Sequence, residues 1–317
     1  MRKFFILSML AVMLLLTACS GDEPKQQESG QIDIYTTVYP LQYFSEQIGG
    51  EFVNVSSIYP PGANEHTFEP TQKDMIALAD ADLFFYIGLG LEGFVENAKK
   101  TLANEHVKFV PVAENIDEEV LQTSTGHSHE EASEHEEEHD HHHGDIDPHV
   151  WLSPTISKDL ALTIKNELVK QLPEQEDTFN KNYEQLAKRL DELDQQFKAL
   201  ADNASKKTFF VSHASFGYIA GNYGLTQIPV AGLNSQNEPS QKELAEIVDL
   251  AKQYDIHYIL FEQNVSSKLT SIIQKEIGAE SLMLHNLSVL TEEDIKNNED
   301  YFTLMEKNLQ TLEKALN

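Results

Sequence analysis

The chain has 317 residues, a formal net charge of −29 at pH 7 and a single cysteine. Such acidity argues against nucleic acid as a partner, because nucleic-acid binding rewards basic stripes, and it suits a protein whose ligand is a cation. One cysteine excludes an internal disulfide framework, and the length is sufficient for two modest domains.

The N-terminal residues predict export and attachment to a membrane. Residues 1–3 are basic at two positions, and residues 4–16 form an uncharged run, shorter than the about 20 residues that a bilayer-spanning helix needs. This pattern is typical of a secretory signal peptide, here residues 1–18; the alternative is an uncleaved anchor. Cys19 follows Leu-Thr-Ala, which resembles a bacterial lipobox, where the thiol is acylated and the cysteine becomes the mature N-terminus.

The rest of the N-terminal region, residues 19–31, is polar and predicts a flexible tether. We expect no later segment to span a membrane. The protein is therefore expected at the extracytoplasmic face of the cell membrane, where its lipid anchor holds it. We expect it to be a monomer.

Two stretches alternate short apolar strands with amphipathic helices. In the first we expect strands at 32–37, 53–59, 83–87 and 107–112, with helices at 41–48, 72–81 and 91–103. In the second we expect strands at 208–212, 227–230, 258–261 and 282–284, with helices at 216–223, 241–254 and 266–277. This alternation predicts an α/β fold with mainly parallel sheets and helices on both faces. The two similar lobes are expected to comprise residues 32–154 and 205–317.

One segment inside the first lobe differs in composition. Residues 126–144 are almost only His, Glu, Asp and Ser, so we expect them to be disordered. Clustered imidazoles and carboxylates bind Zn²⁺, Ni²⁺ or Cu²⁺ weakly and in many geometries. A purification tag would have a similar composition, but this run is internal and interrupted by acids. The histidines expected to form these weak sites are His127, His129, His135, His139, His141, His142 and His143.

A long helix is expected in the connector between the lobes, residues 155–204. Its apolar residues step by four and three along one face: Phe179, Tyr183, Leu186, Leu190, Leu193, Phe197 and Leu200. A helix of about 25 residues is about 40 Å long, so it could pack across both lobes. The alternative is the seam of a coiled-coil dimer, although the stripe covers only about three heptads.

Three further histidines stand next to expected strands or in turn-rich segments. His66 lies in a Pro-Pro-Gly-Ala-Asn-Glu-His stretch after a strand, His149 in Asp-Pro-His-Val-Trp-Leu, and His213 at the end of a strand. Ligands of open α/β sheets bind beyond the carboxyl ends of the strands. A single histidine is more often structural than a ligand, but three at such positions predict a metal site.

These three motifs resemble those of the metal-binding lipoproteins of zinc and manganese ABC transporters. The resemblance runs from about residue 32 to the C-terminus, and Glu-Pro-Ser at 238–240 and Phe-Glu at 261–262 add to it. It implies two lobes bridged by a long helix, a metal ion between them, and His66, His149 and His213 as ligands. It also implies delivery of the ion to a permease with its ATPase.

The resemblance leaves the fourth ligand open. In the manganese branch an aspartate near a late strand supplies an oxygen, but residues 283–287 (Met-Leu-His-Asn-Leu) have none. Three imidazoles and one more ligand suit tetrahedral Zn²⁺, whereas Mn²⁺ prefers more oxygens. The candidates are Glu65, which resembles the carboxylate of the zinc branch, a water molecule, and His285. Zn²⁺ is therefore the expected transported ligand, with Mn²⁺ as the alternative.

Catalysis is the competing interpretation, because three histidines and an open position also describe a catalytic zinc site. A zinc hydrolase needs a general base near the metal-bound water, and no HExxH pattern occurs on a predicted helix. We therefore expect no enzymatic activity. An additional adhesin role is compatible with an acidic surface lipoprotein. Among the other residues, Glu262 could orient a histidine or serve equally well as a structural cap. Trp151 and Phe216 are expected to pack around the site.

Overall fold

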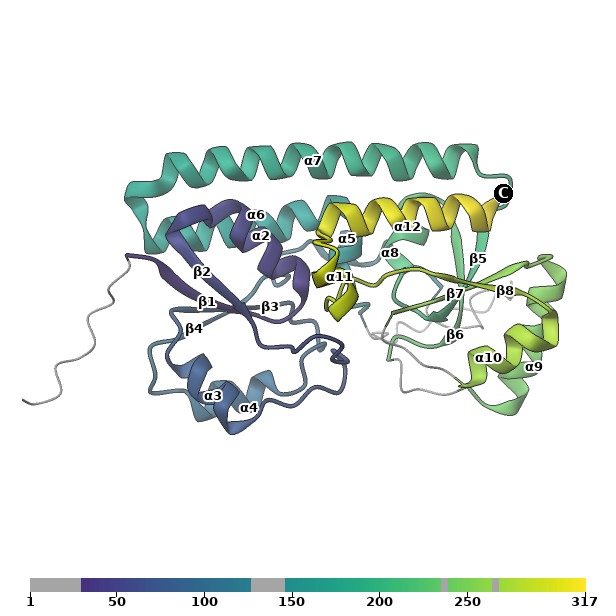
Figure 1. Ribbon diagram of the computed structural model, residues 1–317, viewed down its shortest axis with the longest axis horizontal. Coiled ribbons are helices and arrows are strands. Elements are labelled where there is room, and N and C mark those ends of the chain that lie inside the picture. The colour runs from purple at the N-terminus through teal and green to yellow at the C-terminus, as the bar shows by residue number, and fades with distance from the viewer. Residues whose placement is uncertain (1–29, 127–145, 235–238, 264–267) are drawn as a thin grey trace, which may run out of the picture. The chain divides into compact units, whose positions relative to one another are not determined.

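The computed structural model describes residues 30–126, 146–234, 239–263 and 268–317. The chain divides into two units, Met1–Gln31 and Ile32–Asn317, and the helices and strands labelled in Figure 1 belong to the second. The expected signal peptide, Cys19 and the seven histidines of residues 127–143 lie outside the described residues.

Two four-stranded parallel sheets form the framework of the second unit (Figure 1). The first has the order β2-β1-β3-β4 and consists of β1 (Ile32–Thr36), β2 (Val53–Ser57), β3 (Leu83–Tyr86) and β4 (Lys108–Pro111). The second has the order β6-β5-β7-β8 and consists of β5 (Thr208–His213), β6 (Thr226–Ala231), β7 (Tyr258–Phe261) and β8 (Glu280–Met283). All six strand pairs are parallel, and the strand orders correspond, so the prediction of two similar α/β lobes is confirmed.

Helices cover both faces of the sheets (Figure 1). One layer contains α2 (Tyr39–Gly49), α6 (Pro154–Gln171), α7 (Glu176–Asn203) and α12 (Tyr301–Leu316). The opposite side carries α3 (Gln72–Ala79) and α4 (Val95–Thr101) in the first lobe, and α9 (Gln241–Gln253) and α10 (Lys268–Ile277) in the second. The described residues also include three short helices: α5 (Glu118–Leu121), α8 (Gly217–Asn222) and α11 (Glu292–Lys296). No helix of the described residues is both long and apolar enough to cross a membrane.

The expected long helix is present as α7, which runs alongside both lobes in Figure 1. Two residues of the predicted stripe, Tyr183 and Leu200, are partly buried. The other five are buried: Phe179, Leu186, Leu190, Leu193 and Phe197. The stripe packs against α2, α6 and α12 of the same chain. Its apolar face is therefore covered without the partner helix that a coiled-coil seam would require.

Helix α4 begins at Val95, later than the expected start at residue 91. The backbone φ angles of Gly88, Leu89 and Gly90 are 83°, 55° and 84°, a left-handed run that no α-helix can contain. The buried carboxylate of Glu92 holds this loop by accepting hydrogen bonds from the backbone N–H groups of residues 87 and 88, at 2.8 and 3.0 Å. Residues 91–94, at the start of the predicted helix, therefore belong to a structured loop that precedes α4.

Residues 123–126 of the first lobe lie directly on α8 of the second. Thr125 N–H donates to the carbonyl of Gly217 at 3.2 Å, and the Gln227 side chain donates to the carbonyl of Thr125 at 3.0 Å. The approach requires glycine, because a Cβ at Gly221 would lie 1.6 Å from the Thr123 carbonyl oxygen. The chain therefore enters the histidine-rich segment from a point attached to the second lobe.

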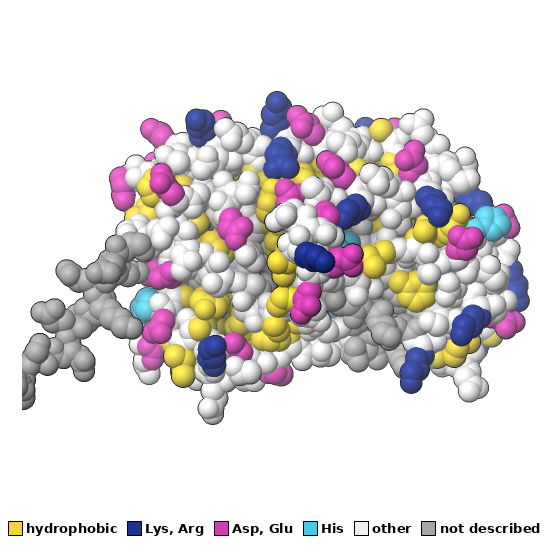
Figure 2. All heavy atoms as spheres, viewed as in Figure 1, with side chains coloured by type: hydrophobic (Ala, Val, Ile, Leu, Met, Phe, Trp, Pro, Cys, Tyr) yellow, Lys and Arg dark blue, Asp and Glu magenta, His cyan; other side chains and the backbone are white. Residues whose placement is uncertain are grey.

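Charged side chains are interspersed over the face of the molecule drawn in Figure 2. Acidic groups alternate there with lysine and arginine and do not gather by sign into separate regions. The chain carries 52 acidic and 23 basic residues, which gives its net charge of −29. This face presents no basic stripe of the kind that phosphate backbones select.

Candidate metal centre

His66 is held in the long turn that follows β2. Its backbone N–H donates to the Asn64 side-chain oxygen at 3.0 Å, an Asx-type contact that shapes the turn. The rings of Tyr59 and Phe68 pack edge to face across the base of the turn, with centroids 4.9 Å apart. The His66 side chain is 7% exposed, so the turn delivers an imidazole from the first lobe into a nearly buried position.

His149 is oriented by the carboxylate of Asp147. The Nδ1 atom of His149 lies 2.7 Å from Asp147 Oδ1, which also accepts the His149 backbone N–H at 2.9 Å. A carboxylate only accepts, so Nδ1 carries the hydrogen and the lone pair of Nε2 faces the site. Asp147 accepts a further hydrogen bond from Ser124. Burial raises the pKa of Asp147, but His149 and Ser124 outweigh it and keep this pKa below its ordinary value.

His213 is the last residue of β5, and its partners come from neighbouring segments. Glu262, which follows β7, places its carboxylate oxygens 3.0 and 3.2 Å from Nδ1 of His213. The prediction that Glu262 orients a histidine is therefore confirmed. The other ring nitrogen, Nε2, lies 2.9 Å from the backbone carbonyl of Leu233. Both nitrogens of His213 therefore face acceptors in this structure, which favours the protonated ring.

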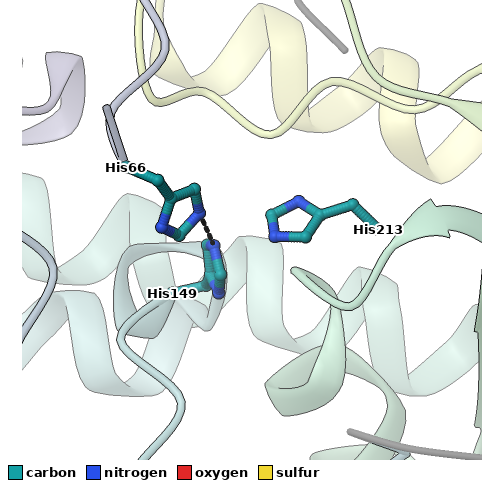
Figure 3. Close-up of side chains that lie close together, drawn as sticks. All are labelled: His66, His149 and His213. Carbon is teal, nitrogen blue, oxygen red and sulfur yellow. Dashed lines mark hydrogen bonds between the residues drawn. The ribbon is translucent and has the colours of Figure 1, made fainter. Parts of the chain in front are cut away.

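The three imidazoles converge on one point (Figure 3). Their ring centroids are 4.9–5.3 Å apart, and the Nε2 atoms of His66 and His149 are separated by 3.3 Å. One nitrogen of each ring lies within 4.8 Å of the other two. Bonds of about 2.0–2.1 Å to a tetrahedral ion would place two nitrogens roughly 3.3 Å apart, so the spacing suits Zn²⁺. Among the described residues this is the one group of three or more potential ligands with such spacing.

The protonation of His66 differs from that of His213. Burial and the neighbouring imidazoles of His149 and His213 lower the pKa of His66 to about 2, so this ring is neutral and ready to bind a cation. Burial alone would lower the pKa of His213, but the carboxylate of Glu262 outweighs it and raises this pKa to about 9. Binding of a metal ion at neutral pH must therefore displace a proton from His213.

Metal affinity is consequently expected to rise with pH up to about 9. Below the pKa of His213 one proton competes with the metal ion, so the apparent Zn²⁺ affinity should increase about tenfold for each pH unit between 6 and 8. Calorimetric titrations in two buffers of different ionisation enthalpy would count the protons, with about one expected from His213. Binding without proton release would contradict this protonation of the site.

Glu65 and His285, two candidates for the fourth ligand, occupy different surroundings. Glu65 is buried beside the three histidines, with Oε1 4.0 Å from His66 Nε2, although it is not part of the three-residue group. Burial, together with the carboxylate of Glu262, raises its pKa. His285 has both ring nitrogens engaged elsewhere: Nε2 lies 3.2 Å from Asp294, and Nδ1 accepts the Leu287 N–H at 2.9 Å.

Two residues with roles at the site were not identified from the sequence. Asp147 stands two positions before His149, and an acid so close to a histidine was a usable signal. Asn286, whose side chain lies between Glu65 and Glu262, gave no signal because its contacts join distant parts of the chain. Trp151 and Phe216 were expected around the site; both are fully buried, and the Trp151 ring lies 5.3 Å from that of His149.

Comparison with known proteins places these observations in a family. The profile of the family described as zinc-uptake complex component A, periplasmic (ZnuA), matches residues 34–315. The zinc-binding protein AdcA of Streptococcus pyogenes serotype M3 is 37% identical over 314 residues, covering 97% of this chain and 60% of AdcA. The high-affinity zinc uptake system protein ZnuA of Bacillus subtilis is 35% identical, covering 96% of this chain and 95% of that protein.

Solved structures agree with these matches. The crystal structure of the Zn(II)-bound ZnuA-like domain of Streptococcus pneumoniae AdcA superimposes with a TM-score of 0.73 at 33% identity, over 90% of this chain and 99% of that domain. The chain spans about 60% of the length of the AdcA relatives it matches, whereas it covers nearly all of the Bacillus subtilis protein. With its two parallel-sheet lobes and long helix, this chain belongs to the ZnuA family of zinc-uptake complex components.

Proposed function

We propose that the protein captures Zn²⁺ between its two lobes and delivers it to an ABC permease and its ATPase. The observation that carries this proposal is the convergence of His66, His149 and His213, with two of their nitrogens at the separation expected for a tetrahedral ion. Family membership adds a second support, because zinc-binding relatives cover nearly the whole chain. Zn²⁺ is here the transported ligand, and no turnover of a substrate is expected.

Glu65 is the proposed fourth ligand. Each oxygen of a carboxylate can accept a hydrogen bond and still offer a lone pair, so the contacts of Glu65 do not prevent it from binding a metal ion. Its Oε1 atom lies 4.0 Å from Nε2 of His66, beside the three imidazoles. His285 is not part of the three-histidine group, and its ring nitrogens contact Asp294 and the Leu287 N–H. The resulting N₃O set suits Zn²⁺ better than Mn²⁺.

Zinc titration of protein purified without a histidine tag or chelating column tests the function. Trp151 is the only tryptophan of the chain, and its ring lies 5.3 Å from His149, so its fluorescence should report occupation of the site. We expect one tightly bound Zn²⁺ that equimolar Mn²⁺ does not displace. Displacement by Mn²⁺ would favour the manganese alternative, and zinc-dependent hydrolysis of esters or peptides would favour the hydrolase.

The transport role has its own test in cells. Deletion of the gene should slow growth in medium depleted of zinc, and added Zn²⁺ should restore it. Normal growth and normal zinc accumulation after deletion, in a strain with no other zinc importer, would contradict the proposed delivery to a permease.

The domain organisation completes the proposal. Residues 1–18 would be the signal peptide, 19–31 the tether, 32–154 and 205–317 the two lobes, and 155–204 the helical connector. The histidines of residues 127–143 would bind additional Zn²⁺ weakly and keep it near the site, because a tethered cluster raises the local concentration of its ligand.

Replacing Cys19 by alanine should release the protein from the membrane fraction. The thiol is the proposed point of acylation, and acyl chains supply the attachment to the bilayer. Immunoblots of membrane and soluble fractions would measure the shift, with His213→Ala as a matched variant that should stay on the membrane. Zinc affinity of Cys19→Ala should equal that of the unmodified protein. Persistent membrane attachment of the variant would contradict the lipobox interpretation.

A further inference from the structure

Asn286 lies where the loop after β8 passes between the lobes, and it is 1% exposed. Its Nδ2 atom donates to Oε1 of Glu65 at 3.0 Å and to Oε2 of Glu262 at 2.6 Å. An amide nitrogen carries two hydrogens, so one is available for each carboxylate. Asn286 thus bridges two buried acids that come from different lobes.

The orientation of this amide is fixed by its other contacts. The Oδ1 atom of Asn286 accepts hydrogen bonds from the Gln263 side chain at 2.7 Å and from the Ser288 N–H at 3.0 Å. The backbone is held as well, because its carbonyl accepts the Trp151 indole N–H at 2.7 Å and its N–H donates to Gln263 Oε1 at 3.1 Å. Exchanging the positions of O and N would place donors against donors, so Nδ2 must face the acids.

The bridge connects ligands of the candidate metal centre. Glu65 is the neighbour of His66 in the chain, and Glu262 contacts Nδ1 of His213. A continuous path therefore leads from His66 through Glu65, Asn286 and Glu262 to His213. Ser288 supports the same path, since its hydroxyl lies 3.0 Å from the second oxygen of Glu65.

We propose that Asn286 is a positioning residue that sets the geometry of the zinc site by linking Glu65 to Glu262, and hence His66 to His213, across the two lobes. This inference rests on the proposed function. A neutral amide suits the task because it satisfies two carboxylates without adding charge, whereas a buried carboxylate left without a donor is costly. The link keeps Glu65, which is next to His66, and Glu262, which contacts His213, in one fixed arrangement.

Loss of the bridge should weaken the site. Residues that orient metal ligands typically contribute on the order of 10–100-fold to metal affinity. We expect Asn286→Ala to weaken Zn²⁺ binding by about this factor, mainly through faster dissociation measured with a competing chelator. Bound Co²⁺ should also change its visible absorption spectrum, because that spectrum depends on the arrangement of the ligands around the ion.

Two further variants separate positioning from packing. Asn286→Asp keeps the shape of the side chain but removes both donors, so it too should change the Co²⁺ spectrum and the Zn²⁺ dissociation rate. Asn308→Ala is the matched control: Asn308 is also 1% exposed and holds the backbone of His285 through two hydrogen bonds of 2.7 Å, but it does not contact either acid. This control should lower the melting temperature without altering the Co²⁺ spectrum.

The outcomes distinguish the inference from the proposed function. If Asn286→Ala and Asn286→Asp both retain the Zn²⁺ affinity and the Co²⁺ spectrum of the unmodified protein, the positioning role is wrong while zinc capture stands. If the unmodified protein does not bind Zn²⁺, both are wrong. Should the variants fail to fold, the unmodified protein labelled with ¹⁵N-asparagine provides the test. The side-chain amide resonances of Asn286 should shift on addition of Zn²⁺. Unchanged resonances would overturn the inference.

Discussion

Replacing His213 by alanine is expected to abolish most of the zinc-induced rise in melting temperature. Bound Zn²⁺ stabilises the folded protein by RT ln(1 + [L]/Kd), which is roughly 4 kcal/mol at a thousandfold excess over Kd. His213 supplies a nitrogen from the second lobe, whereas His66 and His149 come from segments that precede the long helix α7. Without His213 the ion would no longer connect the two lobes, so occupation would stabilise the fold much less.

Two controls make this prediction specific. Deleting residues 126–144, with a short glycine–serine closure, should remove weakly bound Zn²⁺ but leave the melting shift nearly intact. His257→Ala, at a histidine of the second lobe whose side chain is 67% exposed, should change neither. Calorimetric melts with and without one equivalent of Zn²⁺ would compare the three variants. A shift lost on deletion of the segment but kept in His213→Ala would reverse the assignment of tight and weak sites.

Replacing Trp151 by alanine should strongly lower the free energy of unfolding of the metal-free protein. The side chain is fully buried, and removal of a buried aromatic ring typically costs about 3–5 kcal/mol. The ring also packs beside His149 and donates to the carbonyl of Asn286, so zinc affinity should fall as well. Urea denaturation followed by circular dichroism would measure the free energy of unfolding.

Trp151→Phe provides the comparison for this experiment. Phenylalanine keeps most of the buried ring but lacks the indole N–H, so it should lose less stability than alanine while still disturbing the Asn286 loop. Equal losses in both variants would show that the hydrogen bond, and not the buried volume, dominates the contribution of Trp151.

The sequence predicted most of the fold because hydrophobic periodicity follows secondary structure. Strands β1 to β8 and the long helix were recognised from short apolar runs and from a stripe with helical spacing. Helix α12 was missed, although Leu304, Met305 and Leu312 are buried on one of its faces and their spacing was a usable signal. The start of α4 was misplaced because Leu91 and Phe94 extend the apolar pattern, although residues 91–94 belong to the loop that precedes the helix.

The site was predictable only in part. Histidines at strand ends and in turn-rich motifs stand out in a sequence, so the group of His66, His149 and His213 could be anticipated. The bridge formed by Asn286 could not, because it joins residues 221 positions apart through the side-chain geometry of the folded state. Nothing local in the sequence distinguishes this asparagine from one in an ordinary turn.

The C-terminal helix α12 has a consequence for the order in which the chain can fold. Tyr301 is fully buried and packs on Tyr43 and Phe44 of α2, with ring centroids 6.2 and 5.0 Å apart. Residues 43 and 44 are synthesised long before residue 301, so this part of the aromatic face of α2 lacks its cover until α12 has been made. Contacts of such large sequence separation form slowly. Chains in which α12 has not yet docked therefore expose this aromatic surface, which makes them prone to aggregation.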